Sequence, residues 1–145
     1  KPHKTISIVG AFHYYIERIS DTENELFVLE FDENMLTADQ KKYFVPAQDY
    51  PKVVPLSDIV IMTGLTLVNN TIDGLLKACS PKSKLVVTGP SSCLLPDILF
   101  RHHVDIVGGT IITKPEMLFD IVDQGGAAYH LFHYCAEKIC ILNGS

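Results

Sequence analysis

The chain has 145 residues, of which 47% are hydrophobic and 20% are charged, and its formal net charge is −5. This composition is close to that of an average soluble domain and excludes a disordered chain, a fibre and a low-complexity array. A chain of this length buries about two-thirds of its unfolded surface, so its core needs no metal ion or disulfide. We therefore predict one domain over residues 1–145.

Charge and cysteine usage exclude several kinds of partner. Basic residues number 12 against 17 acidic ones, and the densest basic group, at Lys77, Lys82 and Lys84, is typical of a helix end and a solvated loop. We therefore expect no nucleic-acid partner. No apolar run approaches the ~20 residues of a membrane span, so we expect no membrane partner. The four cysteines form no Cys-x-x-Cys pair and are too sparse for a disulfide framework, which predicts a cytoplasmic location.

A short apolar run that ends in glycine occurs four times. The runs cover residues 6–9, 59–63, 85–88 and 104–107, and they end at Gly10, Gly64, Gly89 and Gly108. Such continuous β-branched runs are typical of strands buried on both faces. Residues 26–29 and 139–142 predict two further strands.

Helical patterns lie between these strands. Apolar residues at i, i+3, i+4 and i+7 predict helices over 12–19 and 72–79, and Pro96 suits the first turn of a third helix. A capping box that begins at Thr113 opens a fourth. Residues 32–55 contain three prolines and predict a loop with one or two short helices.

The alternation of strands and helices predicts a doubly wound α/β domain. We expect a mostly parallel sheet of five to six strands, in which the C-terminal run forms an edge strand. Right-handed crossovers bring the carboxyl ends of parallel strands to one edge, and ligands bind along that edge where the strand order reverses. The four glycines are therefore expected on one rim, and the residues after them form the candidate site.

Three sequence blocks carry a family resemblance. They are residues 57–71, with Thr63-Gly64, Thr66-Leu67 and Asn69 before Thr71; residues 88–110, with Thr88-Gly89-Pro90-Ser91 and Leu94-Leu95-Pro96; and Gly125-Gly126. Together they span about residues 10–126 and resemble the uncharacterised Rossmann-like family described as "putative heavy-metal chelation". Leu65 and the Ser92-Cys93 pair depart from the family pattern.

The resemblance implies a Rossmann-like fold and a transition metal ion as a candidate ligand. Members of the family often carry a preceding smaller α/β domain like the N-terminal domain of enolases. This chain has neither that domain nor an initiator methionine, which leaves open that it is the C-terminal part of a longer protein. The macromolecular partners to expect are a companion N-terminal domain or further copies of the chain.

The loop after residues 59–63 is the first candidate site. Gly64 permits a tight turn, and Thr66 or Asn69 can cap the helix that follows. The amides of that helix would then bind a phosphate, a carboxylate or a nucleotide. The alternative is that these residues only cap the helix and shape the turn.

The second candidate site joins two neighbouring strand ends. Pro90 stiffens the turn after Gly89, and Ser91 presents a hydroxyl to the rim, where Gly109 and Thr110 are also expected. The segment lacks the Gly-x-Ser-x-Gly pattern of a nucleophilic serine, which disfavours a hydrolase. A purely structural turn is the alternative.

Gly10 and Glu30 form the third candidate. An acidic residue about 20 positions after a strand-end glycine is typical of ribose binding. Bulky Phe12 stands where a dinucleotide would require close backbone approach, so dinucleotide binding is disfavoured. An adenosine-type cofactor such as S-adenosylmethionine remains open, and the alternative for Glu30 is a solvent-facing charge.

His130, His133 and Cys135 are the candidate metal ligands, because imidazole and thiolate suit transition metals. A helix would align His130 with His133, whereas a strand would align His133 with Cys135. The alternative is that they are ordinary hydrogen-bonded or buried side chains.

These observations predict a domain that binds a small molecule or a metal ion at the glycine-rich carboxyl edge of the sheet. Two alternatives stay open. One is an enzyme that uses an adenosine-type cofactor, and the other is a structural domain of an assembly.

Overall fold

The computed structural model describes residues 3–90, 92 and 96–144. The strands are β1 (Thr5–Val9), β2 (Glu25–Glu30), β3 (Phe44–Pro46), β4 (Ile59–Thr63), β5 (Lys84–Thr88), β6 (Ile106–Ile112) and β7 (Ala136–Leu142). The α-helices are α1 (His13–Ser20), α2 (Tyr50–Val53), α3 (Leu65–Val68), α4 (Ile72–Ala78), α5 (Pro96–Arg101), α6 (Pro115–Asp123) and α7 (Ala128–Tyr134). Single 3₁₀ turns are η1 (Glu33–Met35), η2 (Lys41–Tyr43), η3 (Ala47–Asp49) and η4 (Val54–Leu56).

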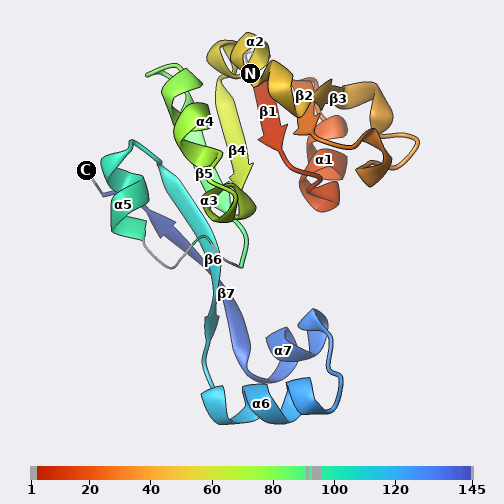
Figure 1. Cartoon of the computed structure of the whole chain (residues 1–145), viewed down its shortest axis with the longest axis vertical. Coiled ribbons are helices and arrows are strands. Elements are labelled where there is room, and N and C mark those ends of the chain that lie inside the picture. The colour runs from red at the N-terminus through yellow and green to blue at the C-terminus, as the bar shows by residue number, and fades with distance from the viewer. Residues whose placement is uncertain (1–2, 91, 93–95, 145) are drawn as a thin grey trace.

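The strands form one sheet in the order β3-β2-β1-β4-β5-β6-β7 (Figure 1). Strands β1 to β6 are parallel, and β7 is an antiparallel edge strand. The predicted α/β class and mostly parallel, Rossmann-like sheet are confirmed. The sheet of the described residues has 7 strands rather than five or six. The missed strand is β3, whose three residues end at Pro46 and are too short to form a recognisable apolar run.

Strand β6 does not end at Gly108, as the sequence pattern predicted. It continues through Gly108, Gly109 and Thr110 because β7 pairs with it along its whole length, from Ile106 opposite Leu142 to Ile112 opposite Ala136. Gly10, Gly64 and Gly89 do follow strand ends, at β1, β4 and β5. The fourth glycine is therefore part of a ladder and not of a rim loop.

Helices cover one face of the central strands completely. On this closed face, side chains of β4, β5 and β6 pack against α4 and α5 and are fully buried. The core residues there include Val60, Met62, Leu75, Leu85, Val87, Leu99 and Val107. No buried side-chain nitrogen or oxygen among the described residues lacks a hydrogen-bond partner.

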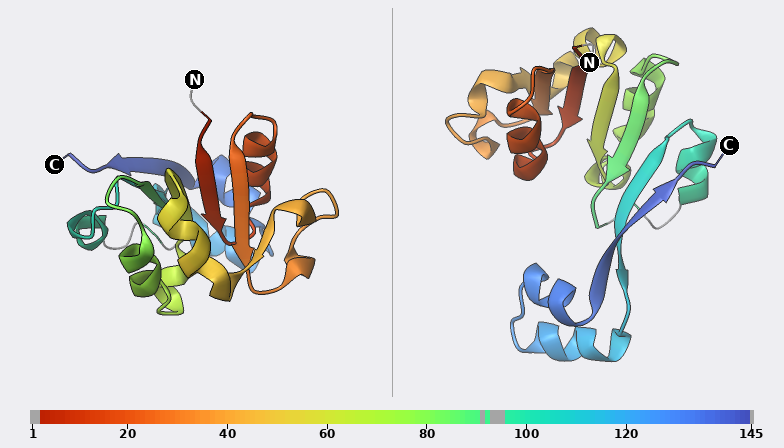
Figure 2. Two further views of the ribbon diagram at one scale, coloured as in Figure 1. Left: turned by 90° about the horizontal axis from the view of Figure 1, so that it is seen from above. Right: turned by 180° about the vertical axis from the view of Figure 1, so that it is seen from behind.

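The opposite face is covered only in part. Over β1 and β2 it packs against Ile16 of α1, which is 0% exposed. Farther along the sheet, Val86 of β5 and Ile106 of β6 lie side by side on this face and are only half-buried. Views from above and behind show α1 confined to one end of the sheet (Figure 2). We call the part around Val86 and Ile106 the open face.

The ladder of β6 and β7 extends beyond the sheet and carries α6 and α7 at its far end (Figure 1). We call residues 110–138 the arm. The predicted capping box at Thr113 is wrong, because Lys114 is the N-cap of α6, Pro115 follows it and no side chain caps the helix. Helix α6 has no buried residue. No helix in the described part of the chain is long and apolar enough to cross a membrane.

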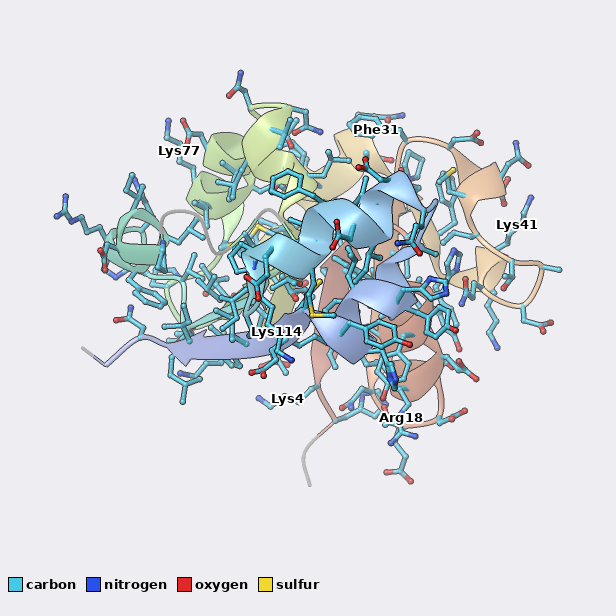
Figure 3. The ribbon with its side chains drawn as sticks, turned by 90° about the horizontal axis from the view of Figure 1, so that it is seen from below. Lys4, Arg18, Phe31, Lys41, Lys77 and Lys114 are labelled. Carbon is cyan, nitrogen blue, oxygen red and sulfur yellow. The ribbon has the colours of Figure 1, made fainter. Side chains whose placement is uncertain are left out.

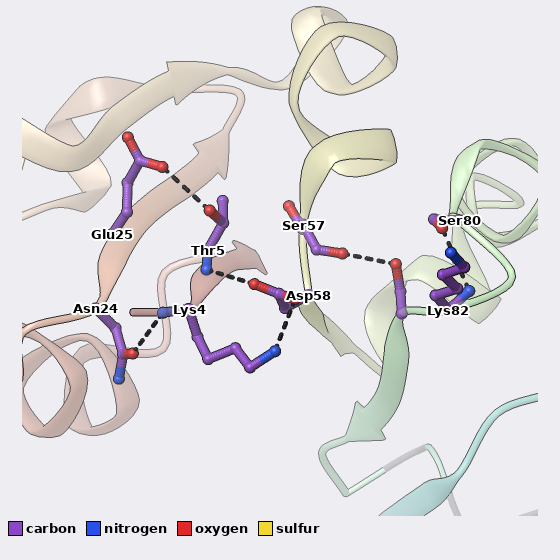
Figure 4. Close-up of polar contacts among 9 residues, drawn as sticks. Lys4, Thr5, Asn24, Glu25, Ser57, Asp58, Ser80 and Lys82 are labelled. Atoms are coloured by element: carbon purple, nitrogen blue, oxygen red, sulfur yellow. Dashed lines mark hydrogen bonds and ion pairs between the residues drawn. The ribbon is translucent and has the colours of Figure 1, made fainter. Parts of the chain in front are cut away.

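Ionic contacts tie the amino ends of the strands together (Figure 4). The carboxylate of Asp58, before β4, accepts hydrogen bonds from Lys4 Nζ at 2.9 Å and from the Thr5 backbone amide at 3.0 Å. The bond from Lys4, and then that from Thr5, holds the pKa of Asp58 below its usual value. Asp105, before β6, binds Lys84 Nζ at 2.7 Å in the same way.

Candidate functional site

The carboxyl edge of the sheet carries two cavities where the sequence predicted one rim. A pocket of about 270 Å³ lies at the ends of β1, β2 and β4, and we call it the switch-point pocket. A cleft of about 550 Å³ lies between α1, the open face and the arm, and we call it the arm cleft. Figure 3 views the molecule from the arm side, with α6 and α7 in front of the body.

Gly10 forms the floor of the switch-point pocket at the end of β1. Its φ is +106°, a conformation that suits glycine, and a Cβ there would lie 3.2 Å from Thr63 Cγ2. Its amide donates to the Leu29 carbonyl at 2.9 Å. Glycine at this position therefore lets the chain turn from β1 toward α1 while leaving the pocket open.

Glu30 ends β2 beside this floor and is partly buried. Its Oε1 accepts the Phe31 amide at 2.8 Å, which fixes the direction of the carboxylate. An ionised carboxylate has about four acceptor positions, so Glu30 has capacity for hydroxyl donors of a ligand.

Thr66 and Asn69 also line this pocket, but neither caps the N-terminus of α3: Thr66 lies within the helix, and Asn69 is its C-cap residue. Thr66 is only 2% exposed. Its hydroxyl donates to the Thr63 carbonyl at 2.7 Å, which fixes the turn after β4. Asn69 Oδ1 accepts from Thr71 Oγ1 at 2.7 Å and from the Thr71 amide at 3.3 Å, which orders the entry to α4. With four and seven residues, α3 and α4 are too short to support the predicted anion site at a helix N-terminus.

The remaining walls of the pocket are largely apolar. Leu29, Leu75 and Tyr50 line its interior, and Phe31 and Leu65 lie at exposed positions on its lining. Tyr50 was not predicted as a site residue, because it comes from the segment before β4, whose sequence carries no strand or site motif. Phe31 was missed although it directly follows Glu30 in the chain.

Gly64 lies between the two cavities and lines neither. Its amide donates to the Thr88 carbonyl at 2.8 Å, and a Cβ would lie 3.0 Å from the Ser92 amide nitrogen. The structure thus gives Gly64 a packing role between neighbouring segments. Predicted Ser91 lies outside the described residues.

The other predicted rim residues line the arm cleft. Gly89, with φ +137°, and Pro90 follow β5, while Gly109 and Thr110 belong to β6. Tyr14 of α1 and Lys138 of β7 complete the cleft, and no sequence motif pointed to them. The structure therefore separates these residues from Gly10 and Glu30.

The three candidate metal ligands do not form a cluster. His130 Nδ1 accepts the Ala127 amide at 2.9 Å, Cys135 is 1% exposed, and the His133 ring contacts that of Tyr134 at a centroid distance of 4.5 Å. Within residues 3–90, 92 and 96–144, no group of three His, Cys, Asp or Glu side chains is placed to hold a metal ion. The donor set of the described chain does not fit a metal centre.

Two solved structures of proteins from the DUF364 family resemble the whole domain. One is a protein of unknown function from Pyrococcus horikoshii, with a TM-score of 0.79 and 23% identity, and the match covers 97% of this chain and 55% of that one. The other, from Desulfitobacterium hafniense, has a TM-score of 0.76 and 22% identity, with 97% and 53% covered. The chain thus spans about half the length of these relatives.

Rossmann-like dehydrogenases share the fold. A prephenate dehydrogenase from A. aeolicus, solved with NAD⁺ and hydroxyphenyl propionate, gives a TM-score of 0.58 at 11% identity, and the match covers 75% of this chain and 42% of that one. No curated protein sequence matches the chain. The profile of one family, DUF364, described as "Putative heavy-metal chelation", matches residues 1–141. The chain therefore belongs to the DUF364 family.

Proposed function

We propose that the domain binds a small organic ligand with a nucleoside-like shape in the switch-point pocket. Strand β2 pairs with one edge of β1, and β4 pairs with the other edge. The strand order therefore reverses at β1. Open α/β sheets bind ligands at this reversal of strand order. The pocket lies there, and Gly10, Glu30, Thr66 and Asn69 line it.

The observation that carries the proposal is that Glu30 is the only charged residue among the described residues that line this mostly apolar pocket. A carboxylate at the end of β2 can accept hydrogen bonds from two neighbouring hydroxyls, as on a ribose. The walls around Leu29, Tyr50 and Leu75 suit a flat, weakly polar ring. Phe12 is the N-cap of α1, where a diphosphate would need a small residue, so the ligand is expected to lack a diphosphate bound at that helix.

Thermal unfolding with added ligands tests the proposal. Adenosine and S-adenosylmethionine are the probes, with transition metal ions as the competing class. A probe at 100 times its dissociation constant stabilises the folded state by about 2.7 kcal/mol, which corresponds to a rise of several degrees in Tm. A response to metal ions without a response to either nucleoside would contradict the proposal.

Two variants assign the response to the pocket. Glu30→Gln removes the negative charge, and we expect it to abolish most of the ligand-induced shift while the Tm of the free protein changes little. Asn69→Ala is expected to reduce the shift as well; a large fall in Tm without ligand would instead assign Asn69 to turn structure alone. Glu33→Gln is the matched control, because Glu33 is exposed and does not line the pocket. Equal ligand shifts in Glu30→Gln and Glu33→Gln would contradict the proposal.

A further inference from the structure

The arm cleft is an apolar groove with aromatic walls. Tyr14 and Tyr15 of α1 line one side and Phe132 of α7 lines the other. The floor includes Val86 and Ile106 of the open face. Parallel strands are normally covered on both faces, so half-buried side chains on interior strands of such a sheet indicate a surface that another protein element covers.

Helix α6 at the tip of the arm carries a ridge that suits this groove. Pro115, Phe119 and Val122 are four and three residues apart, so they lie on one side of the helix, and Phe119 and Val122 are 69% and 54% exposed. No residue of α6 lines the cleft of its own chain. The ridge and the groove are therefore both available within one molecule but do not meet there.

Charge also favours the pairing of these two surfaces. Glu116, Asp120 and Asp123 lie beside the ridge on α6, and that helix contains no basic residue. The described lining of the cleft contains no acidic residue, whereas it includes Lys138, whose Nζ lies 5.2 Å from the Phe132 ring centroid, and His13. An acidic, apolar helix therefore meets a weakly basic, aromatic groove.

We propose that two copies of the chain associate by placing α6 of each copy in the arm cleft of the other. A two-fold arrangement uses the ridge and the groove of each copy once and leaves neither unpaired. The occupant is a second copy because one chain supplies both complementary surfaces.

The exposed aromatic side chains of the groove and the ridge supply about half of the area of a standard interface. Four aromatic side chains of the groove and the ridge are 36% to 69% exposed: Tyr14, Tyr15, Phe119 and Phe132. At about 200 Å² for each complete side chain, they expose on the order of 400 Å² per copy. Standard protein interfaces bury about 800 Å² per partner, and the floor of the cleft and the flanking aliphatic residues contribute further area.

Sedimentation velocity over a wide concentration range tests the proposal. We expect a concentration-dependent dimer. Phe119→Asp on the ridge and Tyr14→Asp in the groove should each weaken the dimer about 30-fold or more, since both place a charge in an apolar contact. Leu56→Asp is the matched control, because Leu56 is 76% exposed in η4, outside the arm and the cleft, and this variant should remain dimeric.

A mixing experiment distinguishes reciprocal insertion from other modes of pairing. The Phe119→Asp variant keeps its groove, and the Tyr14→Asp variant keeps its ridge, so a mixture should form a heterodimer more readily than either variant pairs with itself. A monomeric parent chain at all concentrations would overturn the proposal. So would a Phe119→Asp monomer beside an unchanged Tyr14→Asp dimer, because that result would indicate pairing between two arms. Circular dichroism must show native folding for each variant that is compared.

Discussion

The two faces of strand β5 differ although they are formed by alternating residues of one short strand. Val87 is 0% exposed and packs on the closed face beneath α4 and α5. Its neighbour Val86 points to the other face, lines the arm cleft and remains half-buried. The chain therefore builds a complete core on one side of its sheet only. The other side is suited to contacts with a ligand or another protein surface.

The sharpest test of this difference compares the same substitution at these two neighbours. Val87→Ala removes fully buried methyl groups and should lower the free energy of unfolding by about 2 kcal/mol. Val86→Ala should lower it by less than about 1 kcal/mol, because its side chain contacts an open cleft. Urea unfolding measures both values. Equal losses would show that the open face is as well packed as the closed one.

A second test concerns the close contact of β5 and β6 on the open face. A Cβ at Gly108 would lie 2.7 Å from Thr88 Oγ1, so Gly108→Ala should destabilise the domain by about 1–2 kcal/mol. In a Thr88→Ala background the hydroxyl is absent and most of that loss should disappear. A double-mutant cycle by urea unfolding measures the coupling. An unchanged penalty in the Thr88→Ala background would assign the loss to the backbone instead.

The amino edge of the sheet provides a smaller, pH-dependent effect. Because the folded pKa of Asp58 is lowered, its ionised form stabilises the fold above the ordinary pKa, and this contribution is lost as the pH falls through the lowered value. Asp58→Asn should reduce Tm by no more than about 2 °C at neutral pH and flatten the fall in Tm below about pH 4. Asp39→Asn, at an exposed carboxylate, is the control. Identical pH profiles for the two variants would contradict the assignment.

Thiol labelling compares the two faces without a change in stability. Cys79 packs against the closed-face core, and burial raises the pKa of its thiol to about 11. At pH 8 the thiolate fraction of Cys79 is then on the order of one in a thousand. Cys140 is exposed and lines the arm cleft. Iodoacetamide should therefore modify Cys140 well before Cys79, measured by peptide mass spectrometry in the Phe119→Asp variant so that association does not shield the cleft.

The apolar runs predicted the buried strands because burial on both faces leaves a direct mark on local composition. The end of β6 was not predictable in this way, since Gly108 and Gly109 are held in the strand by pairing with a segment about 30 residues later. The grouping of Gly10 with Glu30 was foreseen from the strand-end pattern, and both line one pocket. The separation of this pair from Gly89, which lines the other cavity, depends on where α1 and the arm pack, and no local sequence pattern encodes that packing.

The return of the chain along β7 has a practical consequence for experiments. Leu142 lies opposite Ile106, where β6 begins, and the Asn143 amide donates to the Asp105 carbonyl at 2.8 Å. Lys4 likewise contacts Asp58 before β4, so both ends of the described chain lie at the amino edge of the sheet (Figure 1). Strand β1, with five residues, is about 17 Å long. Affinity tags, fluorophores or surface anchors attached beyond these ends are therefore expected to leave the switch-point pocket, at the opposite edge of the sheet, accessible.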